Sequence, residues 1–540
     1  MSSEKFFVIG IGGTGMRCIE AFTHLCAIGM FDNREIHVLS IDTDTNNGNK
    51  GRAEQLIDRY VRIKGGAAGA PTADTFFSAK LHLYRFSPEY SGDSLTYKRL
   101  SGLSTGNEEV RRRNRELSQL LFDEDVQEFK LDHGYRAQTH LGSHLMYHAI
   151  VDAARRVRDG NSRDRVVRKE DESLLAFINQ LYDAKEDARV FILGSIFGGT
   201  GASAIPILPK ALGDALKVRD KNLKLSEKAR FACSLLTDYF SFNVPDAQQR
   251  KEQRVIADSN NFARNSQAAL MFYEDDQTVQ RTYERMYHVG WPSRVDWSTD
   301  AAGGTTVTGG GEQQNPAHAA ELLCAAAAHH FFQGEHTAER AEIVYRSANN
   351  SGGSFAFEFK DIVGESHAEE FKAKLTAFYA LCHVMTSHEG SCRNALRRLE
   401  EFKIDDYKNV SDDEARDLDA YFRAFAYGLE KGQVQPGWLL QVRRSVNGPF
   451  LLNADAFSDN PAQLTGLHFG KLLDEVNHQF AVSGGLFGVI GRKKPFEEYA
   501  EALQTNASVK EDPVRQKVLR PNERFVARCY NTLKHLYNFR

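Results

Sequence analysis

Short, uninterrupted apolar runs separate longer amphipathic stretches through the first two-thirds of the chain. Runs of this length predict strands that are buried on both faces of a parallel sheet. We expect five of them, at residues 6–9, 36–41, 190–193, 231–236 and 268–273. Because helical patterns lie between these runs, the sequence predicts an α/β fold, a parallel sheet with helices on both faces.

The segments between the strands carry helical periodicity. After the first strand, apolar residues recur at Met16, Ile19 and Phe22, as one face of a helix requires. Pro316 is expected to open another helix that runs through Phe332, since proline suits a first helical turn. The segment from about 75 to 185 is polar and charged with helical patterning, so we expect a large helical insertion there.

Two further segments differ in composition from the rest. Residues 301–311 are rich in glycine and threonine, which predicts a loop or linker. Beyond about residue 345 the chain is charged and predicts a mainly helical C-terminal region. The charged run at 108–113, which ends in three arginines, is typical of a solvated helix face, although it also suits a phosphate backbone or an acidic partner.

Composition narrows the class of protein. The chain has 540 residues, of which 41% are hydrophobic and 26% charged, as in a globular protein of two or three domains. Its net charge of −4 provides no global field that would attract nucleic acid or an anionic membrane. We expect no membrane span and no signal peptide, because no apolar stretch has the necessary length. Seven irregularly spaced cysteines without a C-x-x-C pair favour a cytoplasmic protein.

A glycine-rich loop follows the first predicted strand and precedes a helix. It has the sequence Gly10-Ile11-Gly12-Gly13-Thr14-Gly15. Glycines at this position let the backbone approach a phosphate, which the amino terminus of the helix then attracts. The loop also matches the dinucleotide-binding pattern G-x-G-x-x-G, in which an acidic residue follows about 20 positions later. Asp42 follows later than that, so a dinucleotide-dependent oxidoreductase stays an alternative.

A second glycine-rich loop follows the strand predicted at 190–193. It includes Gly198, Gly199, Thr200 and Gly201, and it also leads into a helical pattern. Two such loops on one sheet can hold a polyphosphate from two sides. A dinucleotide fold requires only one of them.

The two loops together resemble those of the tubulin/FtsZ superfamily, most nearly its divergent prokaryotic members. The second loop, with Ala204-Ile205-Pro206 behind it, is similar to the signature G-G-G-T-G-[ST]-G, and the first is similar to G-x-G-G-x-G. Residues 41–44 resemble the N-T-D motif after the second strand. Residues 65–71 resemble the third phosphate loop, and 234–242 the stretch before the ribose contact. The resemblance covers roughly residues 5–335 without the insertion.

This resemblance implies that the chain binds GTP or GDP with Mg²⁺. Asp44, and with it Asp42, would orient magnesium-bound water, although a polar strand end is the simpler interpretation of both. The residues implied to contact the phosphates are Gly10, Gly12, Gly13, Thr14 and Gly15 (α and β), Gly198, Gly199, Thr200, Gly201, Ala202 and Ser203 (β and γ), and Ala67, Ala68 and Gly69 (sensing the γ-phosphate).

The sequence departs from the family at several positions. Phe197 replaces the first glycine of the signature, Ser203 replaces the last, and Arg17 stands where the family has a small or amide residue. The acidic loop with which one subunit completes the next subunit's site is not visible. Glu321 and Glu335 are the candidates for its catalytic acid, and a glutamate without a special role is the alternative for each. Asn315, His318 and Glu321 are expected to meet the base.

The sequence therefore predicts a tubulin/FtsZ-like nucleotide-binding domain at 1–335 and a mainly helical domain for assembly or partner contact at 336–540. The implied function is a GTPase that assembles head to tail into filaments. A nucleotide-regulated scaffold or switch, with protein partners on the insertion and the C-terminal region, is the main alternative. His329 and His330 are expected to be a packed pair, not metal ligands.

Overall fold

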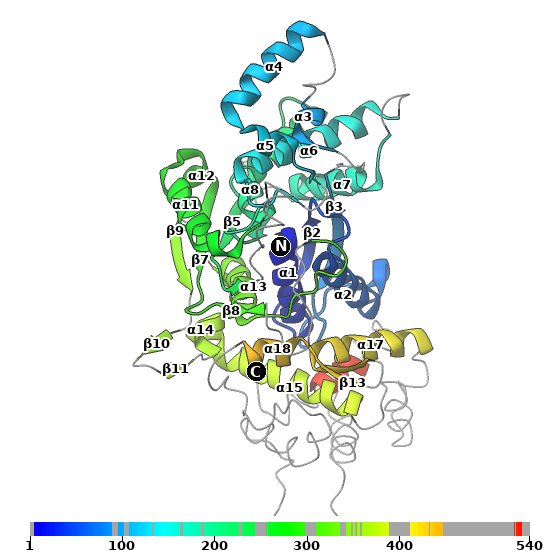
Figure 1. The fold of residues 1–540 in the computed structure, drawn as a ribbon. Helices are drawn as coiled ribbons and strands as arrows, with labels where there is room; N and C mark the ends of the chain where they lie inside the picture. Colours follow the sequence, from blue (N-terminus) through cyan, green and yellow to red (C-terminus); the bar gives the residue numbers. More distant parts are fainter. Residues whose placement is uncertain are drawn as a thin grey trace, which may run out of the picture.

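A seven-stranded parallel sheet forms the centre of the molecule in the computed structural model (Figure 1). Every pair of neighbouring strands in it is parallel. The strand order reverses between β1 and β4, and ligands bind beside the carboxyl ends of strands at such a switch point. The strands lie in the order β3 (Lys80–Phe86), β2 (Glu35–Ile41), β1 (Lys5–Ile11), β4 (Ala188–Leu193), β5 (Ala229–Leu236), β7 (Tyr283–Val289) and β9 (Glu342–Arg346).

The structure describes most of the chain up to residue 445 and a short segment near its end. The described residues are 5–445 without 89–94, 102–106, 132–133, 162–165, 185–187, 226–228, 243–254, 256, 298–308, 335–341, 347–348, 352–353, 357–358, 388–410 and 431–432, together with 523 and 525–531. Three two-stranded pairings lie outside the central sheet: β6 (Phe240–Ser241) with β8 (Val295–Asp296), β10 (Asn349–Ser351) with β11 (Ser354–Ala356), and β12 (Tyr427–Glu430) with β13 (Gln433–Pro436).

Helices cover both faces of the sheet because successive strand residues point to opposite sides. Phe6 and Val8 of β1 belong to one hydrophobic core, and Phe7 and Ile9 belong to the other. On the first face lie α1 (Gly12–Ala27), α2 (Gly48–Lys64), α13 (Ala319–Gln333), α15 (Glu365–Ser387), α17 (Asp412–Phe425) and α18 (Trp438–Arg444). On the second face lie α6 (Thr139–Asp159), α7 (Lys169–Asp183), α9 (Leu208–Arg219) and α12 (Gln277–Thr282).

The α/β class and the first four predicted strands are confirmed. The fifth prediction is wrong, because residues 268–273 lie inside helix α11 (Phe262–Asp275), and the next strand of the sheet is β7. The helix expected from Pro316 begins three residues later, at Ala319. His318 and Glu321 form a capping box there and fix the first turn.

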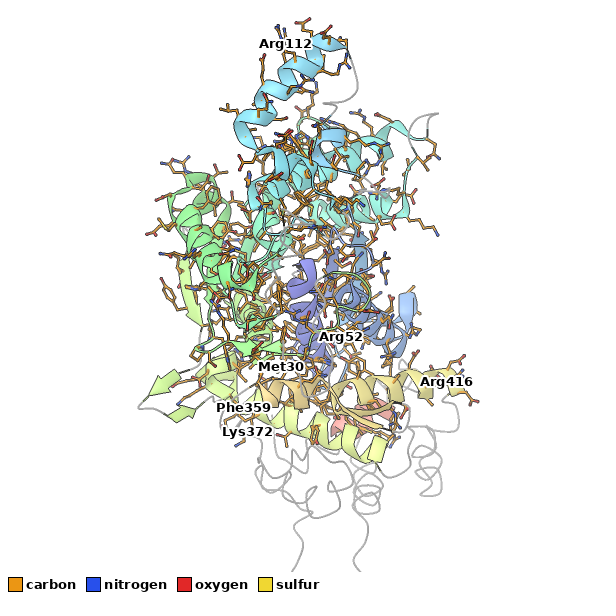
Figure 2. The ribbon with its side chains drawn as sticks, viewed as in Figure 1. Met30, Arg52, Arg112, Phe359, Lys372 and Arg416 are labelled. Carbon is orange, nitrogen blue, oxygen red and sulfur yellow. The ribbon has the colours of Figure 1, made fainter. Side chains whose placement is uncertain are left out.

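The predicted insertion at 75–185 is only partly an insertion. It contains edge strand β3, and α6 and α7 cover one face of the sheet, so much of the segment belongs to the core. The part of the segment that lies beyond this helical layer consists of α3 (Tyr97–Leu100), α4 (Glu108–Leu121) and α5 (Glu124–Glu128). Helix α4, which carries Arg112, projects at the opposite end of the molecule from α17, which carries Arg416 (Figure 2).

The domain boundary expected at 335 cuts through the sheet, because β9 pairs with β7 beyond it. The helices that follow, among them α14 (Phe359–Val363), α15 and α17, share one hydrophobic core with α1, α2 and α13. The described part of the C-terminal region contains short strands as well as helices. None of the described helices has the length and apolar character that crossing a bilayer requires.

Candidate functional site

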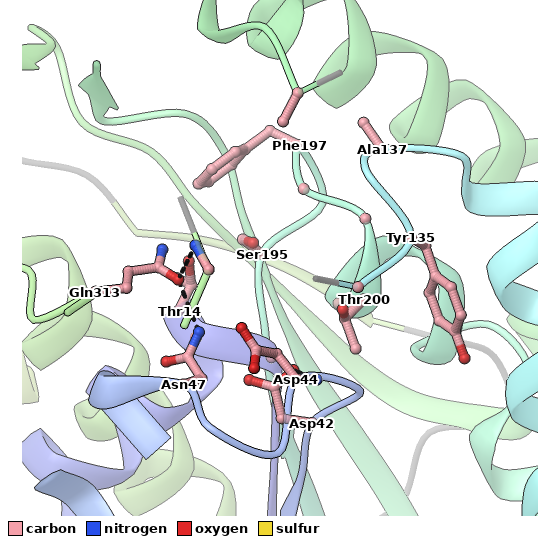
Figure 3. Close-up of a pocket in the computed structure, with 18 of the residues that line it drawn as sticks. Thr14, Asp42, Asp44, Asn47, Tyr135, Ala137, Ser195, Phe197, Thr200 and Gln313 are labelled. Atoms are coloured by element: carbon pink, nitrogen blue, oxygen red, sulfur yellow. Dashed lines mark hydrogen bonds between the residues drawn. The ribbon is translucent and has the colours of Figure 1, made fainter. Parts of the chain in front are cut away.

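A cavity of about 360 Å³ lies at the carboxyl ends of β1 and β4, where the strand order reverses (Figure 3). Both glycine-rich loops predicted from the sequence border it. The loop after β2, the segment that leads into α13, and a turn before α6 form further parts of its wall. The structure therefore brings together segments that are far apart in the sequence.

The first loop lines the cavity with Gly12, Gly13 and Thr14. Gly12 has a φ of +69°, and a Cβ there would lie 3.2 Å from Cβ of Thr200, so the two glycine loops touch. Gly10 and Gly15 lie behind the wall and allow close packing, since a Cβ on Gly15 would lie 2.6 Å from the Leu193 carbonyl oxygen. Helix α1 has no side-chain cap and no acidic residue in its first turn, which leaves its amino terminus suited to an anion.

The second loop lines the cavity with Gly198, Gly199, Thr200 and Gly201. Gly201 must stay glycine, because a Cβ would lie 2.5 Å from the Ser195 carbonyl oxygen. Phe197, which replaces a family glycine, also borders the cavity.

Two residues expected in the second loop do not reach the cavity wall. Ala202 and Ser203 are buried in α8 (Thr200–Ala204). The hydroxyl of Ser203 donates to the Gly199 carbonyl oxygen, so Ser203 supports the loop instead of facing a phosphate.

Asp42 and Asp44 enter the cavity from the end of β2. Asp42 Oδ1 accepts from the Asp44 backbone at 3.2 Å, while its Oδ2 is buried without a hydrogen-bond partner among the described residues. Burial, assisted by the charge of Asp44, raises the pKa of Asp42 to about 7. Asp44 accepts from the backbone nitrogens of Asn46 at 3.1 Å and Gly310 at 2.6 Å. An unpartnered carboxylate oxygen beside a second carboxylate suits a hard divalent cation.

The segment 309–315 is tied to the loop 44–49 by paired polar contacts. Asn47 donates to Gln313 at 2.7 Å, a bond drawn in Figure 3. Asn49 donates to the side chain of Asn315 at 2.8 Å and accepts from its backbone at 2.9 Å. Gly309, which belongs to the loop or linker expected at 301–311, therefore lines the cavity. Residues 301–308 of that segment lie outside the described residues.

Glu321 lies outside the cavity wall, which corrects its assignment as a catalytic or base-contacting residue. Its side chain is fully buried, pairs with Arg17, and accepts from Tyr239 and from the His318 backbone. Arg17 itself borders the cavity and donates to Asn315 at 2.9 Å. From its position behind the wall, Glu321 thus holds the Arg17 side chain at the edge of the cavity and caps helix α13.

The other residues that the sequence suggested for the base or the catalytic acid lie in different places. Asn315 does line the cavity, whereas His318 is buried behind the wall against the rings of Tyr239 and Trp291. Glu335 lies outside the described residues.

A turn at 134–137 was not predicted from the sequence, yet it forms one side of the cavity. Gly134, Arg136 and Ala137 all have positive φ angles. Such angles in non-glycine residues often mark functional loops. Arg136 is held by a bond from its Nη1 to the Val255 carbonyl oxygen at 3.0 Å. A lone glycine followed by Tyr135 gives no motif that could have identified this turn.

The predicted third phosphate loop lies elsewhere. Ala67 and Ala68 are in the 3-10 helix η1 (Gly66–Ala68), between the end of α2 and the start of β3. Lys80, the first residue of β3, donates to the Ala67 carbonyl oxygen at 3.3 Å. Ala67, Ala68 and Gly69 therefore lie at the amino ends of the parallel strands, while the cavity is at the carboxyl ends. Their proposed contact with a γ-phosphate is wrong.

Aromatic side chains complete the cavity, since Phe240, Phe242 and Phe262 line it together with Phe197.

Elsewhere, His329 and His330 are the packed pair that the sequence predicts. Burial lowers the pKa of His329 to about 3, and His330 Nδ1 lies 2.7 Å from the Tyr287 hydroxyl.

The cavity thus combines glycine backbone, one helix amino terminus, two carboxylates and several aromatic rings. Backbone N–H groups at such loops suit phosphate oxygens, and the carboxylates suit a divalent cation that neutralises phosphate charge. Comparison with models of protein families and with curated proteins finds no match for this chain.

Proposed function

We propose that this cavity binds a guanine nucleotide with Mg²⁺, and that the protein is a tubulin/FtsZ-like GTPase that assembles head to tail. The observation that carries the proposal is the contact between the two glycine loops at one cavity, where Gly12 meets Thr200. A single phosphate contact needs one such loop. Two loops that approach from neighbouring strands suit a chain of phosphates.

The charges in the cavity support a nucleotide–magnesium complex in preference to a free anion. Arg17 and Arg136 on the wall would attract phosphate, but Asp42 and Asp44 would repel a bare polyphosphate where they face it, since like charges at close range raise its free energy. The buried, unpartnered Oδ2 of Asp42 supplies a site at which a cation or its water can be held. Mg²⁺ would neutralise phosphate charge there, while the glycine loops hold and orient the phosphates.

The remaining wall suits a purine. Phe240 and Phe242 offer apolar ring surface. The amide oxygens of Asn315 and Gln313 accept from neighbouring residues, so these side chains offer amide N–H groups that can donate to the edge of a base. The choice of guanine over adenine rests on the resemblance of the loops to the tubulin/FtsZ superfamily.

Hydrolysis is proposed to need a second copy of the chain. Among the described lining residues, Asp42 and Asp44 are the only carboxylates, and Glu321 is engaged behind the wall. An acid supplied by the next subunit would complete the site. Such a heterologous contact extends into open filaments.

The test measures phosphate release and right-angle light scattering together, with GTP and Mg²⁺, across a range of protein concentrations. Both signals should rise above one critical concentration. Asp42→Asn should lower both, and ATP or NAD should produce neither. A thermal shift with NAD and none with GTP would instead favour the dinucleotide-dependent oxidoreductase, whose usual strand order resembles that of this sheet.

A nucleotide-regulated scaffold is the second candidate, and helix α4 favours it. Leu117, Leu120 and Leu121 of this projecting helix are 57%, 81% and 50% exposed. Exposed apolar side chains grouped on one helix suit a protein partner. GTP that stays bound through purification, without phosphate release or scattering at any concentration, would favour this candidate over the polymerising GTPase.

A further inference from the structure

Three potential metal ligands gather at the end of the sheet opposite the cavity. Glu35 is the first residue of β2, and His37 lies directly across from His82 of the edge strand β3. All three side chains point to the sheet face that α7 covers, because they alternate in phase with the core residue Leu39. One potential ligand atom from each residue lies within 4.8 Å of the others.

The two imidazole rings are held face to face. Their centroids are 4.8 Å apart and their planes differ by 10°, while Phe7 stacks on the other side of His37 at 4.9 Å. His82 Nε2 lies 2.6 Å from the Glu35 carboxylate. Packing therefore orients His37 firmly, while its partners, Glu35 at the start of β2 and His82 on the edge strand, are partly exposed.

One ring nitrogen of His37 is buried and accepts or donates no hydrogen bond among the described residues. The residue is 2% exposed, and its Nε2 is buried without a hydrogen-bond partner in the described part of the chain. Its other nitrogen, Nδ1, lies 3.0 Å from the Tyr84 hydroxyl. A buried nitrogen without a partner costs free energy, and a metal bond would remove that cost.

We propose that Glu35, His37 and His82 bind one zinc ion, with a fourth position left to water. Two imidazoles and one carboxylate form a donor set that zinc accepts in proteins. The Nδ1–H of His37 would donate to Tyr84, which leaves Nε2 free for the metal and fixes the ring orientation. This site is independent of the nucleotide cavity.

Zinc binding requires the exposed ligands to move. Tetrahedral ligands at zinc bond lengths lie about 3.3 Å apart, so separations of up to 4.8 Å must shrink by up to about 1.5 Å. An imidazole binds a metal in its ring plane, so the His82 ring, which is stacked on His37, must also turn toward the ion. Glu35 and His82 are 34% and 30% exposed and can move, whereas His37 stays fixed by its stacking. The hydrogen bond between His82 and Glu35 is then replaced by two metal bonds.

The bound ion would tie edge strand β3 to β2 at the amino ends of both strands.

The test is a titration of the untagged, chelator-treated full chain with zinc chloride by isothermal calorimetry, in excess Mg²⁺. The matched variants are His82→Gln on the edge strand β3 and Glu35→Gln at the start of β2, both partly exposed, with Tyr84→Phe as the positioning variant. His148→Ala is the control, because His144 and His148 are neighbours on α6, with ring centroids 4.7 Å apart, and form a competing pair.

We expect one zinc per chain, weakened at least about tenfold in His82→Gln and Glu35→Gln and unchanged in His148→Ala. Tyr84→Phe should weaken zinc about tenfold, and far-ultraviolet circular dichroism should show that every variant is folded. Cobalt should give the visible absorption of a tetrahedral site. No zinc binding by the wild type would overturn the proposal, and so would binding that survives His82→Gln or disappears in His148→Ala.

Discussion

Replacement of Glu321 by glutamine separates a structural role of this residue from a catalytic one. The carboxylate pairs with Arg17 and accepts from Tyr239 and from the His318 backbone. Glutamine keeps the size of the side chain but removes the charge and one acceptor. We expect the buried Arg17 guanidinium to lose its counter-ion and the protein to lose stability.

The magnitude follows from the burial of the pair. Arg17 is 1% exposed and Glu321 is not exposed, so water screens their interaction very little. Breaking a buried ion pair by removing one partner costs about 3–5 kcal/mol. Arg17 keeps bonds to Asn315 and Tyr239, which places our expectation near the lower end, at about 3 kcal/mol.

Urea unfolding followed by tryptophan fluorescence measures this loss, since the Trp297 ring lies 5.5 Å from the Arg17 guanidinium carbon. The double variant Arg17→Met/Glu321→Met should recover most of the lost stability, because no unpaired charge stays buried. Asp417→Asn is the control. It breaks a pair whose partner Arg62 is 55% exposed, and it should change the free energy of unfolding by less than about 1 kcal/mol.

One result would refute this reasoning. If Glu321→Gln unfolds within about 1 kcal/mol of the wild type and still binds GTP, but releases no phosphate, then Glu321 acts in catalysis and its role as a buried counter-ion is secondary.

The other predictions concern the cavity and the buried histidines. Asp42→Asn should weaken GTP binding in Mg²⁺ at least about tenfold by calorimetry. Wild-type affinity should rise with pH through about 7, because burial raises the pKa of Asp42 to about 7 and its proton must leave before a cation binds. Gly201→Ala should abolish nucleotide binding, since the new Cβ would lie 2.5 Å from the Ser195 carbonyl oxygen. Burial lowers the pKa of four histidines to about 3, so the unfolded chain binds more protons there and the histidines lower stability by about 5 kcal/mol from pH 7 to 5.5. The raised pKa of Asp42 acts in the opposite direction and offsets about 1.5 kcal/mol, so urea unfolding should show a net loss of about 3 kcal/mol. These histidines are His24, His37, His318 and His329.

Each of these predictions has an outcome that contradicts it. Equal GTP affinity in Asp42→Asn, or affinity that is flat with pH, would remove the carboxylate from the cation site. Gly51→Ala is the control for Gly201, because nothing lies within 4 Å of the added Cβ in helix α2; loss of binding in both variants would argue against a local clash. A free energy of unfolding that is constant between pH 7 and 5.5 would show that the histidines titrate while buried.

The sequence predicts the centre of the sheet but not its edges. Strands β1, β2, β4 and β5 are buried on both faces and appear as continuous apolar runs. Strand β3 lies at the edge and is mostly half-exposed, so polar residues interrupt its pattern and hide it. The run at 268–273 is apolar but lies in helix α11, where Tyr273 is the run's only buried residue, because a short apolar run does not by itself distinguish a strand from a helix.

The candidate site likewise has parts that the sequence predicts and parts that it does not. The two glycine loops could be predicted because their backbones must pass close to each other, and only glycine allows this at Gly12 and Gly201. The turn at 134–137 and the contacts of Asn47 and Asn49 depend on long-range packing and leave no local motif. The glycine-rich segment near 67–69 has the composition of a phosphate loop, but its position before β3 places it at the wrong end of the sheet.

The polar contacts between 44–49 and 309–315 have a consequence for the protein during its synthesis. Both glycine loops leave the ribosome early, but the segment that closes the cavity follows more than 100 residues after the second loop. A nascent chain that ends before residue 309 contains every proposed phosphate contact and lacks one wall. Nucleotide capture should therefore wait at least until the lead into α13 has emerged, and ribosome-bound chains that end before residue 309 should not bind the nucleotide.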